Sequence, residues 1–335
     1  MRLGDCGKTN LHTYSDKEKW SLIRYLDTGS ITEGRIDEIQ TLYPGVDKIP
    51  SRARRKASVG DILFSTVRPN QKHYGIIEAG TENLLVSTGF TVVTVDTTIA
   101  DPYFIYYYLT QSSVIESLQA IAEQSTSTYP SIKPSDIEDI ELDLPELETQ
   151  KKIGSTLRML DRKIALNEEI NDNLEQQAQS YFQELFVDNA DPEWTTGTIS
   201  DLGTVVGGST PSKAKPEYYT ESGIAWITPK DLSNNKSKFV SHGENDITEL
   251  GLRNSSASIM PEGTVLFSSR APIGYIAIAA GEVTTNQGFK SVVPKPEIGT
   301  PFVYFFLKNT LPVIEGMASG STFKEVSGST MKNVP

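Results

Sequence analysis

The amino-acid sequence predicts an α+β fold in which two similar mixed α/β domains are joined by a long helix suited to a coiled coil. Two observations predict this fold. The chain repeats itself, in the same order, at an offset of about 200 residues, and the segment between the copies has apolar residues at helical spacing. A chain of 335 residues is long enough for two cores. We expect a first domain over residues 1–147, the central helix over 148–188 and a second domain over 189–335.

The repeat is clearest where a short apolar strand ends in a polar loop. The first copy reads GDILFSTVRPN at 60–70 and the second reads GTVLFSSRAPIGY at 263–275. Leu-Phe after a glycine turn favours burial, whereas an arginine followed closely by proline cannot continue a sheet. LLVSTGFTVVTV at 84–95 likewise matches VTTNQGFKSVVP at 283–294. Ordered agreement of this extent is hard to produce by chance, so both copies are one kind of domain.

An aromatic block follows in each copy. DPYFIYYYLTQSSVIESL at 101–118 matches TPFVYFFLKNTLPVIEGM at 300–317, and both blocks begin near a proline and continue into helix-like sequence. This pattern predicts the buried start of a helix. A platform on which nucleic-acid bases stack is the alternative reading of so many aromatic side chains.

The segment between the copies predicts a long amphipathic helix. Its apolar residues fall mostly three and four positions apart, and a helix of this length extends about 55 Å at 1.5 Å per residue. The apolar stripe is narrow, as in a coiled coil, and a polar residue within it can fix the register. The seam that we expect to contact a partner helix consists of Ile153, Leu157, Leu160, Ile164, Asn167, Ile170 and Leu174.

Motifs for catalysis and metal binding are missing from the sequence. GDCGKT at 4–9 is only half of a phosphate-binding loop, because Arg2 stands where the first glycine should be. Cys6 is the single cysteine, and the three histidines are far apart in the sequence. There is no nucleophile elbow and no adenine-methyltransferase motif. We therefore predict no catalytic residue, no metal and no cofactor in this chain. A hydrolase whose carboxylates meet only in space is an alternative.

Polar loops at the ends of apolar strands are the remaining candidates for a functional surface. Arginine, asparagine and glutamine can hydrogen-bond base edges, while serine, threonine and lysine suit the DNA backbone. Ordinary solvated loops have the same composition, which is the competing interpretation. The candidate contacts are Arg52, Arg54, Arg55, Arg68, Asn70 and Lys72 in the first copy, and Ser209, Thr210, Lys213, Lys230, Ser269, Arg270, Asn286, Gln287, Thr322 and Lys324 in the second.

The net charge of −12 argues against nonspecific binding of nucleic acid, because phosphates repel an acidic chain. The distribution of charge weakens this objection. Residues 191–335 carry 12 basic and 14 acidic side chains, and RARRK at 52–56 forms a dense basic cluster. A local basic patch on an acidic protein and a merely solvated charge run are both compatible with this pattern.

Several of these loops together resemble a known family. GGSTPS at 207–212, WITPKDL at 226–232, TNQGFKSVVP at 285–294 and ASGSTFKEVSGSTMKNVP at 318–335 look like a target recognition domain of the specificity subunit of type I restriction-modification systems. In the first half, LDLPELETQKKIGSTLRMLDRKIALNEEINDNLEQQ resembles the start of that family's central spacer helix. The resemblance covers nearly the whole chain.

The resemblance implies a noncatalytic subunit that binds double-stranded DNA. Each recognition domain would read one half of a split site through the major groove, and the helix would set the distance between the halves. Modification subunits would supply S-adenosylmethionine and adenine methyltransferase activity, and restriction subunits would add ATP- and Mg-dependent cleavage. We expect Arg68 and Arg270 to reach bases or phosphates from equivalent positions, and Lys213, Lys230 and Lys324 to contact the backbone. A cytoplasmic protein without membrane contact is expected, since no run of 18 apolar residues exists.

Two features depart from the family pattern. The first copy lacks the GGSTPS loop, and the second copy stops at KNVP where the first continues into its helix. The family pairs its central helix with a second one near the C-terminus. We therefore expect residues 153–185 to pair with a helix from another copy of this chain, a separate fragment or a modification subunit. The alternative from another class is a protein-interaction scaffold, with two adaptor domains on a coiled-coil rod and no role in nucleic-acid binding.

Overall fold

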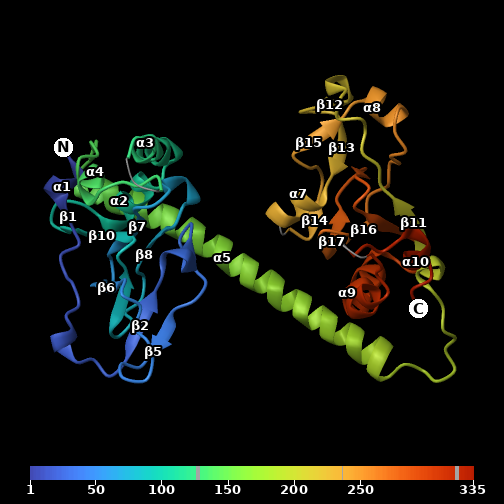
Figure 1. Cartoon of the computed structure of the whole chain (residues 1–335), viewed down its shortest axis with the longest axis horizontal. Helices are drawn as coiled ribbons and strands as arrows, with labels where there is room; N and C mark the ends of the chain where they lie inside the picture. Colours follow the sequence, from blue (N-terminus) through green and yellow to red (C-terminus); the bar gives the residue numbers. More distant parts are fainter. Residues whose placement is uncertain (126–128, 236, 321–323) are drawn as a thin grey trace. The chain divides into compact units, whose positions relative to one another are not determined.

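The computed structural model describes residues 1–125, 129–235, 237–320 and 324–335, and it contains two compact units, Met1–Glu169 and Ile170–Pro335 (Figure 1). Each unit combines two small sheets with helices. A long helix, α5 (Leu147–Gln183), begins in the first unit and ends in the second. The predicted α+β fold class is confirmed.

The first unit holds two four-stranded sheets. One has the order β1 (Gly7–Thr9), β10 (Phe90–Val95), β7 (Ile62–Ser65), β8 (Tyr74–Ile76), and all its pairs are antiparallel. The other has the order β5 (Gln40–Leu42), β2 (Ile23–Leu26), β9 (Leu84–Ser87), β6 (Ala53–Lys56), and β2 runs parallel to β9. This unit also contains a two-stranded sheet of β3 (Ile31–Thr32) and β4 (Arg35–Ile36), short 3-10 helices, and the α-helices α1 (Leu3–Cys6), α2 (Pro102–Leu109), α3 (Ser112–Glu123) and α4 (Pro134–Glu138).

The second unit repeats this plan. Its larger sheet has the order β11 (Gly203–Gly207), β19 (Lys290–Pro294), β16 (Val265–Ser269), β17 (Ile273–Ala279), β14 (Phe239–Val240). The smaller sheet has the order β12 (Tyr219–Thr220), β15 (Asn245–Ile247), β13 (Ile224–Ile227), β18 (Thr284–Thr285), with β13 parallel to β18. The helices are α6 (Ile199–Leu202), α7 (Pro229–Asn234), α8 (Glu249–Arg253), α9 (Thr300–Gly316) and α10 (Gly328–Lys332).

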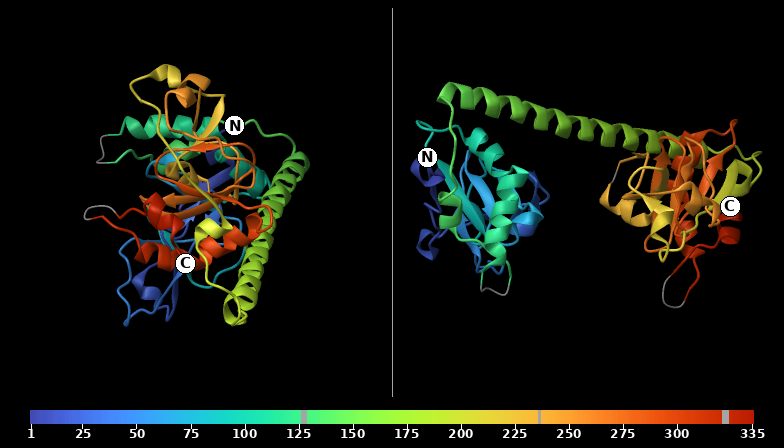
Figure 2. Two further views of the ribbon diagram at one scale, coloured as in Figure 1. Left: turned by 90° about the vertical axis from the view of Figure 1, so that its right-hand side faces the viewer. Right: turned by 90° about the horizontal axis from the view of Figure 1, so that it is seen from above.

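A central strand that is buried on both faces explains the apolar run in each copy. In β7, Ile62 and Phe64 pack with the helices, whereas Leu63 faces the second core of the unit. In β16, Val265 and Phe267 pack against α9, which lies along this sheet (Figure 2). Because successive strand residues point to opposite faces, a strand between two cores must be apolar throughout. The prediction of a buried strand after each glycine turn is confirmed.

The pairing register shows which residues of the two copies correspond. Ser65 pairs with Phe90 in the first unit, and Ser268 pairs with Phe289 in the second. Two positions further along, Val67 therefore corresponds to Arg270. The predicted equivalence of Arg68 and Arg270 is wrong by one residue, and a shift of one position turns a side chain in another direction.

The true counterpart of Arg68 is Ala271, and the backbone supports this assignment. Both residues have a positive φ, 48° in Arg68 and 50° in Ala271, and each is followed by a proline. Two residues before it, Thr66 accepts from Ile132 N as Ser269 accepts from Val326 N. The turn after the strand is thus kept in both copies, while the arginine occupies a different place in it.

The helix α5 is attached to each unit by its own set of contacts. In the first unit the Arg158 guanidinium lies 4.3 Å from the Tyr103 ring centre and donates to Glu78 at 2.8 Å. In the second unit Glu175 accepts hydrogen bonds from Tyr304 at 2.8 Å and from Lys308. The described chain continues from α5 into a π-helical turn at Glu184–Asp188.

Most of the predicted seam is exposed along α5. Ile153, Leu160, Ile164, Ile170 and Leu174 are between 40% and 58% exposed, Asn167 is also exposed, and Leu157 is half-buried. An apolar row of this length in contact with water is unfavourable for an isolated helix. None of the described helices is both long enough and apolar enough to span a membrane.

Candidate nucleic-acid interface

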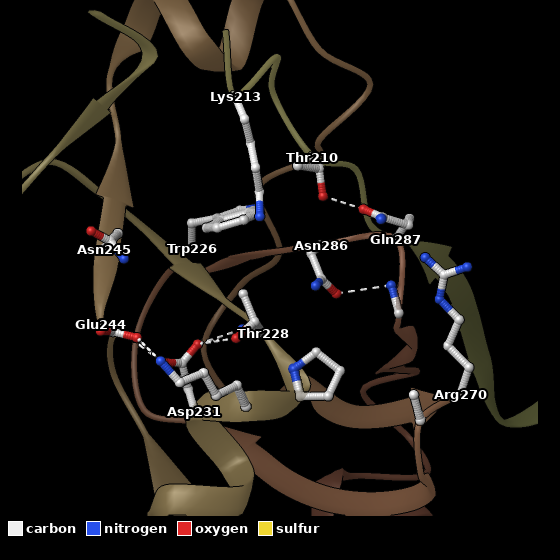
Figure 3. Close-up of a pocket in the computed structure, with 14 residues that line it drawn as sticks. Thr210, Lys213, Trp226, Thr228, Asp231, Glu244, Asn245, Arg270, Asn286 and Gln287 are labelled. Carbon is white, nitrogen blue, oxygen red and sulfur yellow. Dashed lines mark hydrogen bonds and ion pairs between the residues drawn. The ribbon is translucent and has the colours of Figure 1, made fainter. Parts of the chain in front are cut away.

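A pocket of about 480 Å³ in the second unit brings six of the predicted contact residues together (Figure 3). They come from loops that are distant in the sequence and converge at one end of the two sheets. The six residues are Thr210, Lys213, Lys230, Arg270, Asn286 and Gln287. Trp226, Thr228, Asp231, Glu244 and Asn245 complete much of the lining.

Thr210 of the GGST segment lines this pocket because the backbone of the segment lies directly against the loop after β18. A Cβ atom on Gly208 would be 2.0 Å from the Asn286 carbonyl oxygen and 2.4 Å from that of Thr285. The next residue, Ser209, donates its N–H to the Thr285 carbonyl at 2.9 Å. Its own carbonyl accepts from Trp226 Nε1 at 3.0 Å. Glycine at position 208 is therefore required for the two loops to meet.

The start of α7 forms another side of the pocket. Asp231 accepts hydrogen bonds from both the backbone N–H and the hydroxyl of Thr228, at 2.7 and 2.6 Å. Its second oxygen accepts from the Glu244 N–H at 2.8 Å. Lys230 donates to the Glu244 carboxylate at 2.7 Å, and this hydrogen bond raises the lysine pKa. An exposed ion pair of this kind is weak in water, so Lys230 can exchange its partner at little cost.

Arg270 enters the pocket from the turn between β16 and β17. Its Nη1 atom lies 3.4 Å from Glu325 Oε2, and Lys290 Nζ lies 3.8 Å from the other oxygen of the same carboxylate. One carboxylate thus faces two cations. Only one guanidinium nitrogen of Arg270 lies near it, so the other N–H groups are left as donors for a partner. The side chain is half-buried, which limits its conformations.

Asn286 and Gln287 are held by hydrogen bonds to their amide oxygens. Asn286 Oδ1 accepts from the Gly288 N–H at 2.8 Å, and Gln287 Oε1 accepts from the Thr210 hydroxyl. Figure 3 shows each oxygen directed at its partner within the lining. The Gly288 N–H therefore fixes the orientation of the Asn286 amide, and the Thr210 hydroxyl holds the Gln287 amide in place.

The other candidates of the second unit lie outside this pocket. Ser269 is completely buried and donates its hydroxyl to the Gly288 carbonyl at 3.1 Å, so it supports the loop and is not placed for contact with a partner. Ser209 is half-buried, with its hydroxyl oxygen accepting from Ser256 N at 3.3 Å. Lys324 is exposed, and Thr322 lies outside the described residues.

In the first unit, the basic cluster lies on β6 beside a second pocket of about 450 Å³. Arg54 lines this pocket together with Tyr14 and Trp20, whose ring centres are 4.7 Å apart. Arg52 is exposed, whereas Arg55 is half-buried and burial lowers its pKa. The cluster is thus only partly available to a partner.

The remaining three candidates of the first unit lie on the loop between β7 and β8. The Arg68 guanidinium is 5.3 Å from the Tyr129 ring centre, and Lys72 forms an ion pair with Glu33. The Asn70 N–H donates to Gln119 on α3 at 3.2 Å. All three side chains are exposed, and none of them lines the pocket that contains Arg54.

The acidic part of the pocket in the second unit was not predicted from the sequence. Asp231 belongs to the WITPKDL segment, of which only Lys230 was considered, and its position three residues after Thr228 is a recognisable capping signal. Glu244 has no such signal, because only the fold brings it beside Lys230. In the described part of the chain no group of three potential metal ligands occurs.

Comparison with known proteins places the chain in a family. The sequence model of the type I restriction modification DNA specificity domain matches it twice, at residues 52–176 and 192–335. These matches cover most of the chain and correspond to its two copies. The chain therefore belongs to the family of type I restriction-modification DNA specificity proteins, as the sequence predicted.

Individual relatives agree with this assignment. The chain is 42% identical over 158 residues to the type I restriction enzyme MjaIX specificity subunit of Methanocaldococcus jannaschii, which covers 47% of the chain and 36% of that subunit. It is 25% identical to the HindI specificity subunit of Haemophilus influenzae, over 96% of the chain and 84% of that subunit. The crystal structure of a type I S subunit from M. genitalium matches all of the chain and 82% of its own length, with 17% identity and a TM-score of 0.57, which shows the shared fold.

Proposed function

We propose that this protein is the DNA specificity subunit of a type I restriction-modification complex, and that it recognises a split site in double-stranded DNA. The observation that carries the proposal is the convergence of Lys213, Lys230, Arg270, Asn286 and Gln287 on one open pocket. These side chains supply hydrogen-bond donors for base edges and cations for phosphates. The family assignment disfavours the alternative of a scaffold without a nucleic-acid role.

The charge of the chain is compatible with this function because binding depends on the local field. A net charge of −12 opposes long-range attraction to DNA, but three cations line one pocket of the second unit and outnumber its two carboxylates, Asp231 and Glu244. We propose that the first unit reads the other half-site, with Arg52, Arg54 and Arg68 as its main cationic contacts. Partner subunits that also contact DNA would offset the overall repulsion.

The methyltransferase and nuclease activities belong, in this proposal, to partner subunits. Modification subunits would bind S-adenosylmethionine and methylate adenine, and restriction subunits would bind ATP and Mg²⁺. This chain would hold none of these cofactors and would carry no catalytic residue. A cytoplasmic location would follow from work on cellular DNA.

The exposed seam of α5 supports a second part of the proposal, namely that residues 153–185 pair with another helix. The exposed row of Leu160, Ile164, Ile170 and Leu174 has the spacing of a coiled-coil stripe. A second copy of this chain is the partner that we test first, by sedimentation of the purified chain. Replacing Ile164 with Glu should shift a self-paired species to monomer, whereas a wild-type monomer with a protease-sensitive helix would contradict self-pairing.

The specificity function is tested by coexpression with the cognate modification subunit. The purified complex is used to methylate plasmids that contain random sequence, and methylated adenines are mapped. Methylation confined to a motif of two short half-sites with a fixed gap is expected. Unspecific methylation, or a complex that methylates equally well without this chain, would refute the proposal.

A further inference from the structure

In the pocket of the second unit, more hydrogen-bond donors than acceptors are left for a partner. The amide oxygens of Asn286 and Gln287 are both occupied, by the Gly288 N–H and the Thr210 hydroxyl respectively. The NH₂ groups are the parts of these side chains that are left for a partner. Figure 3 shows Gln287 between Thr210 and Arg270, with Asn286 beside it, so that donors gather on this part of the lining.

The two carboxylates of the pocket are engaged by the protein itself. Asp231 accepts three hydrogen bonds, from Thr228 N, Thr228 Oγ1 and Glu244 N, at distances between 2.6 and 2.8 Å. Glu244 is engaged by Lys230 on the side of the pocket opposite Arg270 (Figure 3). A base edge placed near Asn286 and Arg270 therefore meets hydrogen-bond donors. Both carboxylates of the pocket already accept hydrogen bonds from the protein.

This distribution discriminates between bases. Guanine presents two acceptors, N7 and O6, in the major groove, whereas adenine and cytosine each present an amino group that needs an acceptor. An asparagine or glutamine reads adenine by using its oxygen and its NH₂ together, and the hydrogen bonds already made by the oxygens of Asn286 and Gln287 compete with this pairing. Arginine is well suited to pair with both guanine acceptors.

We propose that the second recognition domain reads guanine, through Arg270 and the NH₂ groups of Asn286 and Gln287, and that Thr210 fixes this preference by holding the Gln287 oxygen. The inference rests on the proposed function and specifies the base that this pocket accepts. Thr210 acts here as a positioning residue. The proposed preference for guanine requires only that the two amide side chains keep the orientation that their hydrogen bonds give them.

The first experiment identifies the site and its guanines. The full chain, in complex with its modification subunits, selects duplexes from a randomised library, and the selected half-sites are resynthesised with single base analogues. 7-Deazaguanine lacks the N7 acceptor, whereas hypoxanthine keeps N7 and O6 and lacks only the minor-groove amino group. We expect 7-deazaguanine at one position to weaken binding by about 5-fold to 150-fold. Hypoxanthine at the same position should have little effect.

Variants assign that guanine to the second domain. Gln287→Glu and Asn286→Asp are nearly isosteric, keep an oxygen for the existing bond and replace the NH₂ donor by an acceptor. Each adds a negative charge that weakens all DNA binding, so the informative quantity is the ratio of affinities for guanine and 7-deazaguanine within one variant. At least one of the two variants should bring this ratio close to one. Arg68→Gln, in the first domain, should weaken binding to both duplexes alike and leave this ratio unchanged, which makes it the control for the assignment to the second domain.

Thr210→Val tests the positioning step with little change in shape. Without the hydroxyl, the Gln287 amide is free to turn and to offer its oxygen to an adenine. We expect the selected half-site to accept adenine where the parent requires guanine, with melting of the chain unchanged. A pure loss of affinity without a change of preference would contradict the role of Thr210.

The outcomes separate this inference from the proposed function. Selection of a split motif in which no guanine responds to the variants of Asn286, Gln287 and Arg270 would overturn the inference and leave the specificity function intact. Failure to select any sequence would refute the specificity function, and the inference with it. In a further outcome, the guanine position tolerates 7-deazaguanine and still rejects adenine. If this rejection is lost when Gln287 is replaced, the result would support the inference with O6 as the contacted acceptor.

Discussion

The two domains use one scaffold but arrange their candidate contacts differently. In the second domain, loops after β11, β13, β16 and β18 deliver six candidates to one pocket. In the first, the candidates lie at β6 and on the loop between β7 and β8, and Arg54 lines the pocket beside β6. The residues that correspond to Asn286 and Gln287 are Ser87 and Thr88, and Ser87 is completely buried. The strands are therefore common to both domains, whereas the loops decide what each domain presents.

The largest effect is expected from the glycine that lets the loops of the second domain meet. Gly208→Ala would place a Cβ 2.0 Å from the Asn286 carbonyl oxygen, so the loop must move away. We expect a loss of about 3 kcal/mol in the stability of this domain, or displacement of Asn286 and Gln287 with loss of one half-site. Gly207→Ala is the matched control, because the nearest atom to its Cβ would be Lys290 Cδ at 3.9 Å. Equal melting and binding for both variants would contradict this account of the pocket.

Arg270→Ala sharpens the comparison of the two arginines. It should cost about 1 to 3 kcal/mol of binding and relax sequence preference at one position of one half-site. Arg68→Ala should change the other half-site only, because Arg68 lies in the first domain and its register counterpart in the second domain is Ala271. Binding to variant duplexes measures both effects. If Arg270→Ala discriminated among all sequences as the parent does, the base-reading role would be disproved.

The two domains also differ in how they hold α5, through Arg158 in the first domain and through Glu175 in the second. Burial by itself would raise the pKa of Glu175, but hydrogen bonds from Lys238, Lys308 and Tyr304 outweigh burial and lower it to about 2. Since the folded pKa lies below the ordinary value of 4.5, the stabilisation is complete above pH 4.5 and declines as the pH falls towards 2. Glu175→Gln should destabilise the second domain by about 1.5 kcal/mol at pH 7.

The pH dependence provides the control for this helix contact. The difference in unfolding free energy between parent and Glu175→Gln should shrink when denaturant unfolding is repeated near pH 3. Glu169→Gln changes an exposed residue of the same helix and should have little effect at either pH. A Glu175→Gln effect that does not depend on pH would show that packing, and not charge, attaches the helix here.

The sequence predicted the scaffold well because the repeat carries strand and helix signals twice. Gly-turn strands, the Gly-Phe turns and the long helix follow from local patterns, and the register of Phe90 and Phe289 confirms the alignment. The site was harder to predict. Arg68 and Arg270 are each close to a proline, which suggested an equivalence that the strand register excludes. The role of Glu244 depends on a contact between separate loops, and no local pattern encodes it.

The smallest effects separate phosphate contacts from base contacts among the lysines of the second domain. Lys213 has no ion-pair partner among the described residues, whereas Lys230 must leave Glu244 before it can bind a phosphate. Lys213→Ala should therefore weaken binding by under about 1 kcal/mol for all sequences alike and reduce the salt slope by about one. Lys230→Ala should have a smaller effect, because Lys230 can bind a phosphate only by giving up its ion pair with Glu244. Titrations at several salt concentrations test both variants, and a sequence-dependent loss at Lys213 would assign it to base recognition.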